Sequence, residues 1–248
     1  MQKNSIDLKE KLKKEYCYKI ELHAHTSPAS SCGEASPEQL VKIYKDLGYD
    51  ALVLTNHFIS DYVSFKDKRL SKDEHLKIYL DDYVKTKEAG DRCGLNVLLG
   101  AELRFIQNSN DYLLYGTDYD ILSKAYDYLK IGLKEFREEV KLENSLLIQA
   151  HPFRQGIERV DSKLLDGIET FNMHPGHNGA IGFAARYAKE QGFSITTAGS
   201  DFHHLGLGHE GVAAIRTKKL PKDSFELAEI LKSGDYVFEI GDNSIVIP

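Results

Sequence analysis

Short apolar runs that alternate with amphipathic stretches are the feature that most restricts how this chain can fold. The runs have the length of buried strands, and the stretches between them carry apolar residues at helical spacing. This pattern predicts an α/β sheet or barrel in which helices cover the strands. The expected strands are Tyr18–Leu22, Ala51–Leu54, Asn96–Leu99, Tyr112–Tyr115, Leu146–Gln149, Gly167–Phe171, Ser194–Thr197 and Val212–Ile215, with Tyr236–Glu239 and Ser244–Ile247 as a closing pair.

The expected helices lie between these runs. Ser36 is a good N-cap and Pro37 suits the first helical position, so a helix should begin there and end near Gly48. The 248 residues favour one barrel-sized domain, 1–248, whose residues 1–16 form an N-terminal lead-in. Further helices are expected over Ser71–Ala89, Ile131–Glu143, Gly179–Glu190 and Asp223–Leu231.

Charge and cysteine content exclude several classes of protein. A formal net charge of -6 disfavours extended nucleic-acid binding, which usually needs surplus Lys and Arg. Three widely spaced cysteines form neither a disulfide framework nor a CxxC metal site. The lysine-rich N-terminus lacks the apolar core of a signal peptide, and no apolar run approaches membrane-spanning length. We therefore expect a cytoplasmic protein, and the sequence does not indicate its oligomeric state.

Polar residues that could carry chemistry lie at or just after the ends of short apolar runs in many of the expected strands. In a barrel of parallel strands, the carboxyl ends of all strands open on one face, which is where active sites form. Residues far apart in the sequence would then meet in one site. These residues are His23, His25, Asn56, His57, Glu102, His151, Glu169, Asn172, Asp201 and His203.

The spacing of two of these pairs suits a bound cation. His23 and His25 stand two residues apart, so on an extended strand both side chains point the same way. Asp201 and His203 repeat this spacing with an oxygen and a nitrogen ligand. Taken alone, either pair could be a chance surface arrangement.

Three single residues could be explained by an ordinary structural role as well as by metal binding. Glu102 follows an apolar run and needs a partner if buried, which could be a cation or nearby Arg104. His57 could be a hydrogen-bonded core histidine, and His151 could be a turn residue before Pro152. Six apolar runs followed by such residues nevertheless favour a metal site. Mixed imidazole and carboxylate ligands suit Zn, Mn or Fe better than an all-oxygen Mg or Ca site.

The ordered motifs resemble those of the polymerase and histidinol phosphatase (PHP) family from about Tyr18 to His203. The resemblance implies a distorted (β/α)7 barrel of the TIM-like type that binds two or three metal ions and hydrolyses phosphoesters. The motifs are His23-Ala24-His25-Thr26, Thr55-Asn56-His57, Gly100-Ala101-Glu102, Ala150-His151-Pro152 and Gly199-Ser200-Asp201-Phe202-His203.

The resemblance also implies a role for each matching residue. His23, His25 and Asp201 would hold the first metal, and Glu102 would bridge it to a second metal held by His151. His57 and His203 would hold the third. Glu169 and Asn172 would support the ligands from behind.

Three positions depart from the family pattern. Asn56 stands where the family usually has aspartate, so one negative charge is missing. Asp111 stands in place of a histidine of the second metal. A third-metal ligand after the His23–His25 pair is missing, and Cys32, followed by Glu34, is the nearest candidate. Cys32 could equally be a plain loop thiol.

These residues predict metal-assisted hydrolysis of a small phosphorylated substrate through a metal-bound water of lowered pKa. Arg154 is the candidate phosphate clamp, because guanidinium binds phosphate in a bidentate fashion. His174 and His177 could protonate the leaving group or recognise substrate. All three could also be solvated loop residues. The alternative functions are a non-catalytic metal-binding domain and a nuclease or nucleotidase acting on short nucleic-acid ends.

Overall fold

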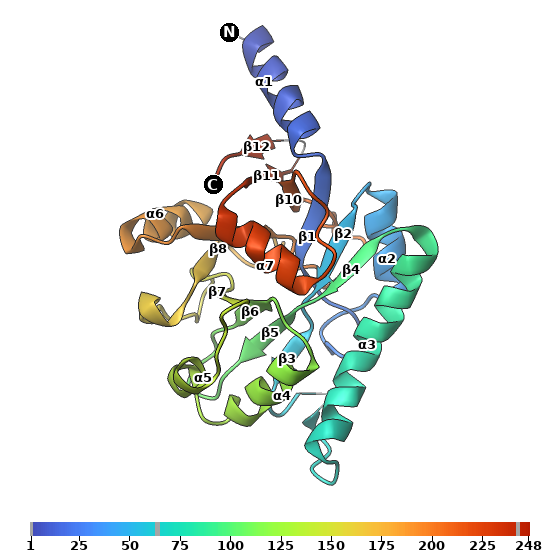
Figure 1. The fold of residues 1–248 in the computed structure, drawn as a ribbon, viewed down its shortest axis with the longest axis vertical. Helices are drawn as coiled ribbons and strands as arrows, with labels where there is room; N and C mark the ends of the chain where they lie inside the picture. The colour runs from blue at the N-terminus through green and yellow to red at the C-terminus, as the bar shows by residue number, and fades with distance from the viewer. Residues whose placement is uncertain (1, 63–64, 242–243) are drawn as a thin grey trace.

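The computed structural model describes residues 2–62, 65–241 and 244–248. Strands form the centre of the molecule and most helices lie around them, while α1 extends away from the rest (Figure 1). The helices are α1 (Gln2–Glu15), α2 (Pro37–Asp46), α3 (Lys72–Cys93), α4 (Tyr119–Tyr128), α5 (Leu133–Glu139), α6 (Ile181–Gln191) and α7 (Ser224–Ser233), with a 3-10 turn η2 (Ser162–Leu164). The strands are β1 (Tyr18–Ala24), β2 (Ala51–Leu54), β3 (His57–Ile59), β4 (Asn96–Leu99), β5 (Ala101–Arg104), β6 (Tyr112–Tyr115), β7 (Leu146–Gln149), β8 (Gly167–Asn172), β9 (Ile195–Gly199), β10 (Ala213–Thr217), β11 (Tyr236–Ile240) and β12 (Ser244–Val246).

The strands form two six-stranded sheets of mixed direction. The first has the order β12-β11-β10-β1-β2-β4, in which β1, β2 and β4 are parallel while β10, β11 and β12 run antiparallel to their neighbours. The second has the order β3-β5-β6-β7-β8-β9, in which only β6 runs antiparallel to its neighbours. The fold is therefore α/β, but its strands are not uniformly parallel.

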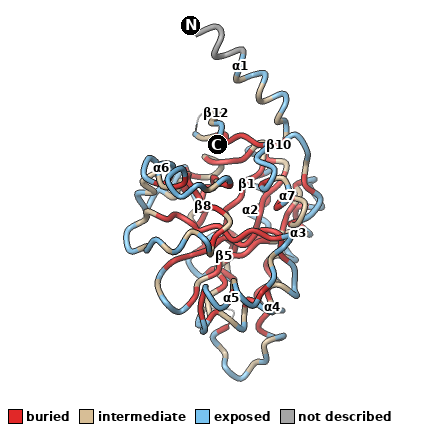
Figure 2. The backbone as a smooth tube through the Cα atoms, turned by 60° about the vertical axis from the view of Figure 1, so that its left-hand side comes forward, coloured by how far each residue is buried: buried red, intermediate tan, exposed pale blue. Residues whose placement is uncertain are grey.

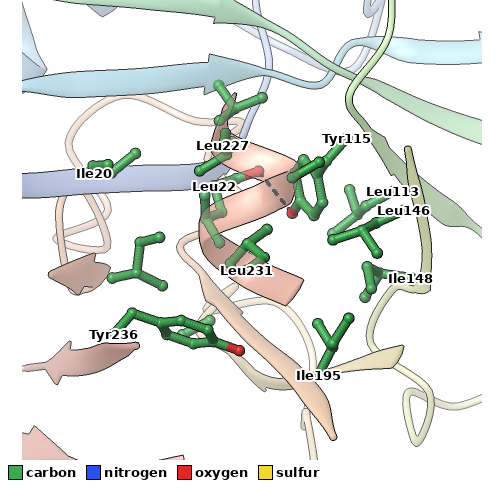
Figure 3. Packing of buried hydrophobic residues seen from close by; sticks show 14 of the residues in the cluster. Ile20, Leu22, Leu113, Tyr115, Leu146, Ile148, Ile195, Leu227, Leu231 and Tyr236 are labelled. Carbon is green, nitrogen blue, oxygen red and sulfur yellow. Dashed lines mark hydrogen bonds between the residues drawn. The ribbon is translucent and has the colours of Figure 1, made fainter. Parts of the chain in front are cut away.

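The main core lies between the two sheets and is completed by α7. Leu227 and Leu231 of α7 pack against buried residues of both sheets (Figure 3). The hydroxyl of Tyr115 in β6 donates a hydrogen bond of 3.1 Å to the carbonyl of Leu22 in β1, which ties the sheets together. Apart from β12, the strands are the most deeply buried part of the chain, and the helices present exposed residues on their outer sides (Figure 2).

Two outer clusters fix the helices to the sheets. Leu40 and Tyr44 of α2 pack against the first sheet, where Leu52 and Leu54 of β2 face outward. A second cluster packs α3, α4, α5 and α6 against the outside of the second sheet. The capping box of Ser71 satisfies backbone N–H groups at the start of α3, which explains why that helix begins there.

The sheets meet at two places that position the candidate ligands. Ala24 at the end of β1 forms a parallel bridge with Phe202, and the N–H of His25 donates to the Phe202 carbonyl at 3.1 Å. The chain passes from β4 to β5 through Gly100, whose N–H donates to the carbonyl of Leu54 at 3.0 Å. A Cβ on Gly100 would lie 2.7 Å from a methyl group of Val53. The close crossing therefore requires glycine.

A register irregularity in β1 re-aims its histidines. Ile20 and Leu22 belong to the core between the sheets, but Ala24, two residues further, belongs to the outer cluster. The pairing of β1 with β2 shifts between Glu21 and Ala24, as in a β-bulge, which reverses the usual alternation. His23 and His25 therefore face the site instead of the helices.

Several expected elements need correction. Helix α4 and strands β3 and β5 were not expected, and the lead-in contains helix α1. The helix expected over Ile131–Glu143 is shorter, because Gly132 with φ 156° precedes it and Val140 is extended. Strand β5 escaped prediction because Gly100 resembles a strand end, whereas it bends the chain between two strands.

The expected position of the site residues also changes. His151, Asp201 and His203 follow strands as expected, and Glu169 lies within a strand as its expected bounds imply. His23, Glu102 and Asn172 instead lie within strands, and His57 begins β3. A closed (β/α)7 barrel and a single domain over 1–248 remain predictions. In the described part of the chain, every helix is too short or too polar to cross a membrane.

Candidate metal centre

Glu102 lies at the centre of a buried cluster of histidines. It is fully buried in β5, a position that parallel pairing places beside His57 of β3. One carboxylate oxygen, Oε1, lies 3.4 Å from Nε2 of His23 and 3.1 Å from Nε2 of His151. The other, Oε2, lies 3.4 Å from Nε2 of His25 and 2.8 Å from Nδ1 of His57. Arg104, the alternative partner, does not pair with Glu102 but with Asp111.

Asp201 is the second carboxylate of the cluster. Its Oδ1 lies 3.3 Å from Nε2 of His23, 3.4 Å from Nε2 of His25 and 3.2 Å from Nδ1 of His203. The side chain of His203 in turn places Nε2 3.4 Å from Nε2 of His57. Two carboxylates and five histidines from five segments of the chain therefore converge on one place.

The contacts around these atoms fit a bound cation better than hydrogen bonds. Nε2 of His23 and of His25, Nδ1 of His57, Oε2 of Glu102 and Oδ1 of Asp201 are buried without a hydrogen-bond partner. Ligand atoms around a tetrahedral ion with bonds of roughly 2.1 Å lie roughly 3.4 Å apart, which matches the separations of 3.3 and 3.4 Å. The donor set thus suits divalent metal ions. Among the residues that the structure describes, three groups could hold one: His23, His25 and Glu102; His25, His57 and His203; and His57, Glu102 and Asp111.

Glu169 and Asn172 hold the ligands in place. Oε1 of Glu169 accepts a hydrogen bond from Nδ1 of His23 at 2.9 Å, which leaves Nε2 of that ring free to bind a metal. Oε2 of Glu169 accepts from the backbone N–H of His151 at 3.0 Å. The Asn172 amide donates to both Glu169 and Asp201, at 2.9 and 3.1 Å. Both side chains lie where a supporting role was predicted.

Asn56 organises the loop that follows β1. Its Oδ1 accepts hydrogen bonds from the Thr26 N–H at 2.8 Å and the Ser30 hydroxyl at 3.0 Å, and its amide donates to the Thr26 hydroxyl at 2.9 Å. Ser30 also contacts Nδ1 of His25 at 3.2 Å and accepts from the N–H of His57 at 2.9 Å. The asparagine therefore positions two candidate ligands through Ser30.

Charges within the cluster stabilise one another. Burial by itself lowers the pKa of His57, but the carboxylate of Glu102 together with Cys32 and Asp111 outweighs burial and raises the pKa to about 10. The same balance, with Asp201 as the carboxylate, raises the pKa of His203 to about 10. Burial favours protonation of Glu102 and Asp201, yet the surrounding imidazolium groups hold both pKa values well below the usual range. Protonated histidines thus balance the negative charge of the two carboxylates, a role that bound metal cations could also fill.

Backbone strain coincides with two candidate ligands. His151 has a φ of 30° and Asp201 a φ of 51°, in the left-handed region that residues other than glycine rarely adopt. Such strain is retained where the surrounding structure fixes the residue, and it is frequent at functional sites. The strained backbone turns both side chains toward Glu102 and His23.

A cavity of about 280 Å³ opens onto the cluster. Arg154, His174 and His177 line it, and their role in a substrate site remains a prediction. Burial lowers the pKa of His174 to about 4, so this ring is neutral at pH 7. A larger cavity of about 470 Å³ lies beside α3, α4 and α7, but none of the clustered histidines lines it.

Cys32 is exposed at the edge of the same cavity. The hydroxyl of Tyr62 donates to its Sγ at 3.2 Å. Burial raises the pKa of the thiol, but hydrogen bonds from His203 and His57 outweigh it and lower the pKa to about 5. Cys32 belongs to none of the three candidate groups, so its role as a ligand remains a prediction.

Three residues of the site escaped prediction from sequence. Buried Glu21 accepts hydrogen bonds from the backbone of His23 and Ser200, at 2.9 and 3.0 Å. A carboxylate two residues before His23 in an apolar run was a usable signal for it. Nothing in the sequence distinguishes Ser30, and Arg104 had been considered only as a partner of Glu102.

A model of the PHP domain family matches residues 21–242, a range that contains every candidate ligand. No curated protein sequence matches the chain.

Solved structures with low sequence identity resemble the fold. A two-domain protein from Bacteroides vulgatus that contains a predicted PHP-like metal-dependent phosphoesterase is 15% identical, with a TM-score of 0.63, over 90% of this chain and 65% of that chain. A suggested metal-dependent phosphoesterase from Bifidobacterium adolescentis is 17% identical, with a TM-score of 0.48, over 86% of this chain and 95% of that one. An amidohydrolase from Chromobacterium violaceum with bound sulfate and no metal is 15% identical, with a TM-score of 0.49, over 75% of this chain and 88% of that chain. The Bacteroides structure supports the fold alone.

Proposed function

Because the chain belongs to the PHP family, we propose that it is a metal-dependent phosphoesterase that hydrolyses a phosphomonoester of a small molecule. One observation carries this proposal: Glu102 and Asp201 are buried among histidine nitrogens at separations of 3.3 and 3.4 Å that suit a shared cation. Two or three divalent ions of Zn, Mn or Fe would satisfy these atoms.

The ligands divide between neighbouring ions. His23, His25 and Asp201 would hold the first, and Glu102 would bridge to a second beside His151. His57 and His203 would hold the third. When bound, such ions lower the pKa of a coordinated water and neutralise phosphoryl oxygens.

The protein's own cavity residues would bind and orient the substrate. Arg154 lines the cavity and can donate two parallel hydrogen bonds to a phosphoryl group. Burial lowers the pKa of both His174 and His177 below the ordinary value, so neither ring is a ready proton donor at pH 7. Their proposed role is therefore recognition of substrate rather than protonation of the leaving group.

The size of the cavity supports a small substrate. A volume of about 280 Å³ is near the lower end for small-molecule sites. The net charge of -6 gives no electrostatic reason to bind a long polyanion.

Exposed, unpaired Cys17, Cys32 and Cys93 support a reducing, cytoplasmic location.

The test is a substrate panel on purified protein of measured metal content. We expect turnover of an aryl phosphate and of some small sugar, amino-alcohol or nucleoside phosphates, and its loss on chelation. Efficient cleavage of short oligonucleotides instead would favour a nuclease. Fully metal-loaded protein that hydrolyses nothing in the panel would indicate a non-catalytic domain.

Glu102→Ala tests the centre itself. Removal of the shared carboxylate should release metal and lower turnover by about a hundredfold or more, while circular dichroism stays that of the parent. A variant with full metal content and parental turnover would show that Glu102 does not bridge ions.

A further inference from the structure

Asp111 differs from the other buried carboxylates of the site in its partner. It is completely buried just before β6, and Nε and Nη2 of Arg104 donate to its two oxygens, each at 2.7 Å. Glu102 and Asp201, by contrast, form ion pairs only with histidines in the described residues. Of the three carboxylates that are candidate metal ligands, Asp111 is thus already neutralised by a permanent cation.

Strand pairing explains this ion pair. Strands β5 and β6 are antiparallel, with Glu102 opposite Leu113 and Leu103 opposite Tyr112. Continuation of this register brings Arg104 opposite Asp111, where oppositely charged side chains contact directly. The planar guanidinium matches the carboxylate in a bidentate fashion, which fixes both side chains.

The same Asp111 could otherwise be a metal ligand. It belongs to the candidate group with His57 and Glu102, and its Oδ2 lies 3.8 Å from Nε2 of His151. A divalent ion there would share both oxygens with Arg104 and lie close to a positive charge in a buried environment, where such repulsion is strong. The ion pair therefore competes with a cation for this position.

We propose that Arg104 takes the place of a metal ion beside Asp111, so that this part of the centre carries a guanidinium instead of a further divalent cation. Arg104 lines the same cavity as Arg154. Its third nitrogen, Nη1, makes no hydrogen bond within the part of the chain that the structure describes. The guanidinium therefore supplies the positive charge on this wall of the cavity.

Metal stoichiometry tests this inference. Wild-type protein, Arg104→Met and the double variant Arg104→Met/Asp111→Asn are stripped with chelator, reloaded with excess Zn²⁺ or Mn²⁺, freed of loose metal and analysed by mass spectrometry. Arg104→Met should retain one more ion per chain than wild type, because Asp111 becomes available. The double variant should return to the wild-type number.

The controls separate charge from folding. Arg104→Lys keeps the positive charge and should keep the wild-type stoichiometry, as should Arg186→Met, which removes an arginine exposed on α6. Arg104→Gln replaces Arg104→Met if the latter does not fold. Equal metal content in wild type and the neutral variant, or an extra ion in Arg104→Lys, would overturn the proposal. The inference rests on the metal centre of the proposed function, but its test measures the number of bound metal ions and not activity. Absence of turnover would therefore not affect it.

Discussion

Glu169 acts on two candidate ligands through its two oxygens. One oxygen accepts from the His23 ring and the other from the backbone N–H of His151 and the amide of Asn172. All of these groups donate, so the site requires an acceptor at both ends of the side chain. An amide cannot meet that requirement, because one of its ends is itself a donor.

Glu169→Gln should therefore weaken metal binding by about 10- to 100-fold, since the His23 ring and the His151 backbone lose their fixed orientation. Competition with a chromophoric chelator measures this affinity. Glu143→Gln, on an exposed glutamate, is the matched control and should bind metal as the parent does. Parental affinity in Glu169→Gln would mean that the carboxylate is dispensable.

At the residue scale, the sequence could predict which side chains meet but not every partner. The strand-end pattern and the family motifs brought His23, His25, Glu102 and Asp201 together, and the structure places them in one cluster. The pairing of Arg104 with Asp111 could not be predicted, because it depends on a hairpin register that the sequence does not reveal. The contacts of Ser30 depend on a loop conformation with no readable motif.

Among the elements, β9 passes very close to β1 at Gly199. A Cβ at Gly199 would lie 2.4 Å from Cβ of His23 and 2.9 Å from Oε1 of Glu169. The end of β9 can approach the site this closely only without a side chain.

Gly199→Ala should therefore displace His23, lose metal affinity and destabilise the fold by about 1–3 kcal/mol through overpacking. Denaturant unfolding and metal content measure the two effects. Gly182→Ala is the control, because a Cβ there meets nothing within 4 Å and alanine favours the helix. If Gly199→Ala were as stable and as metal-rich as Gly182→Ala, the close approach would have no importance.

At this scale the sequence predicted elements better than their directions. Apolar runs such as Leu146–Gln149 gave strand bounds that the structure reproduces, because burial on both faces leaves a continuous apolar signal. Antiparallel β6 and β10 carry the same kind of run, so periodicity could not separate them from parallel strands. Helix α4 was not predicted, because its ten residues bury only Leu122 and Ala125, which is too few to produce a clear helical period.

For the whole molecule, protons and metal ions compete for one buried cluster. The pKa values of His57 and His203 are raised to about 10, so protonation of these rings stabilises the metal-free fold below the ordinary histidine pKa of about 6.5. That stabilisation declines as pH rises from about 6.5 and is lost near pH 10. Metal-bound histidines are neutral and contribute no such dependence.

The chelated protein should therefore lose thermal stability steadily from pH 6.5 to 9.5, whereas the metal-loaded protein should change less and unfold at a higher temperature throughout. Thermal unfolding followed by circular dichroism at constant ionic strength measures both. Parallel pH profiles with and without chelator would contradict the link between this cluster and stability.

Nε2 of His25 belongs to two candidate groups, one with His23 and Glu102 and the other with His57 and His203. An imidazole nitrogen has a single lone pair and can coordinate only one ion at a time. If His25 coordinates an ion together with His23 and Glu102, the other group keeps only His57 and His203. An ion there must complete its coordination with other ligands. The two positions therefore differ in the number of ligands that the protein supplies. As the concentration of free metal falls, the position of His57 and His203 should empty first, while the position of His23, His25 and Glu102 stays filled.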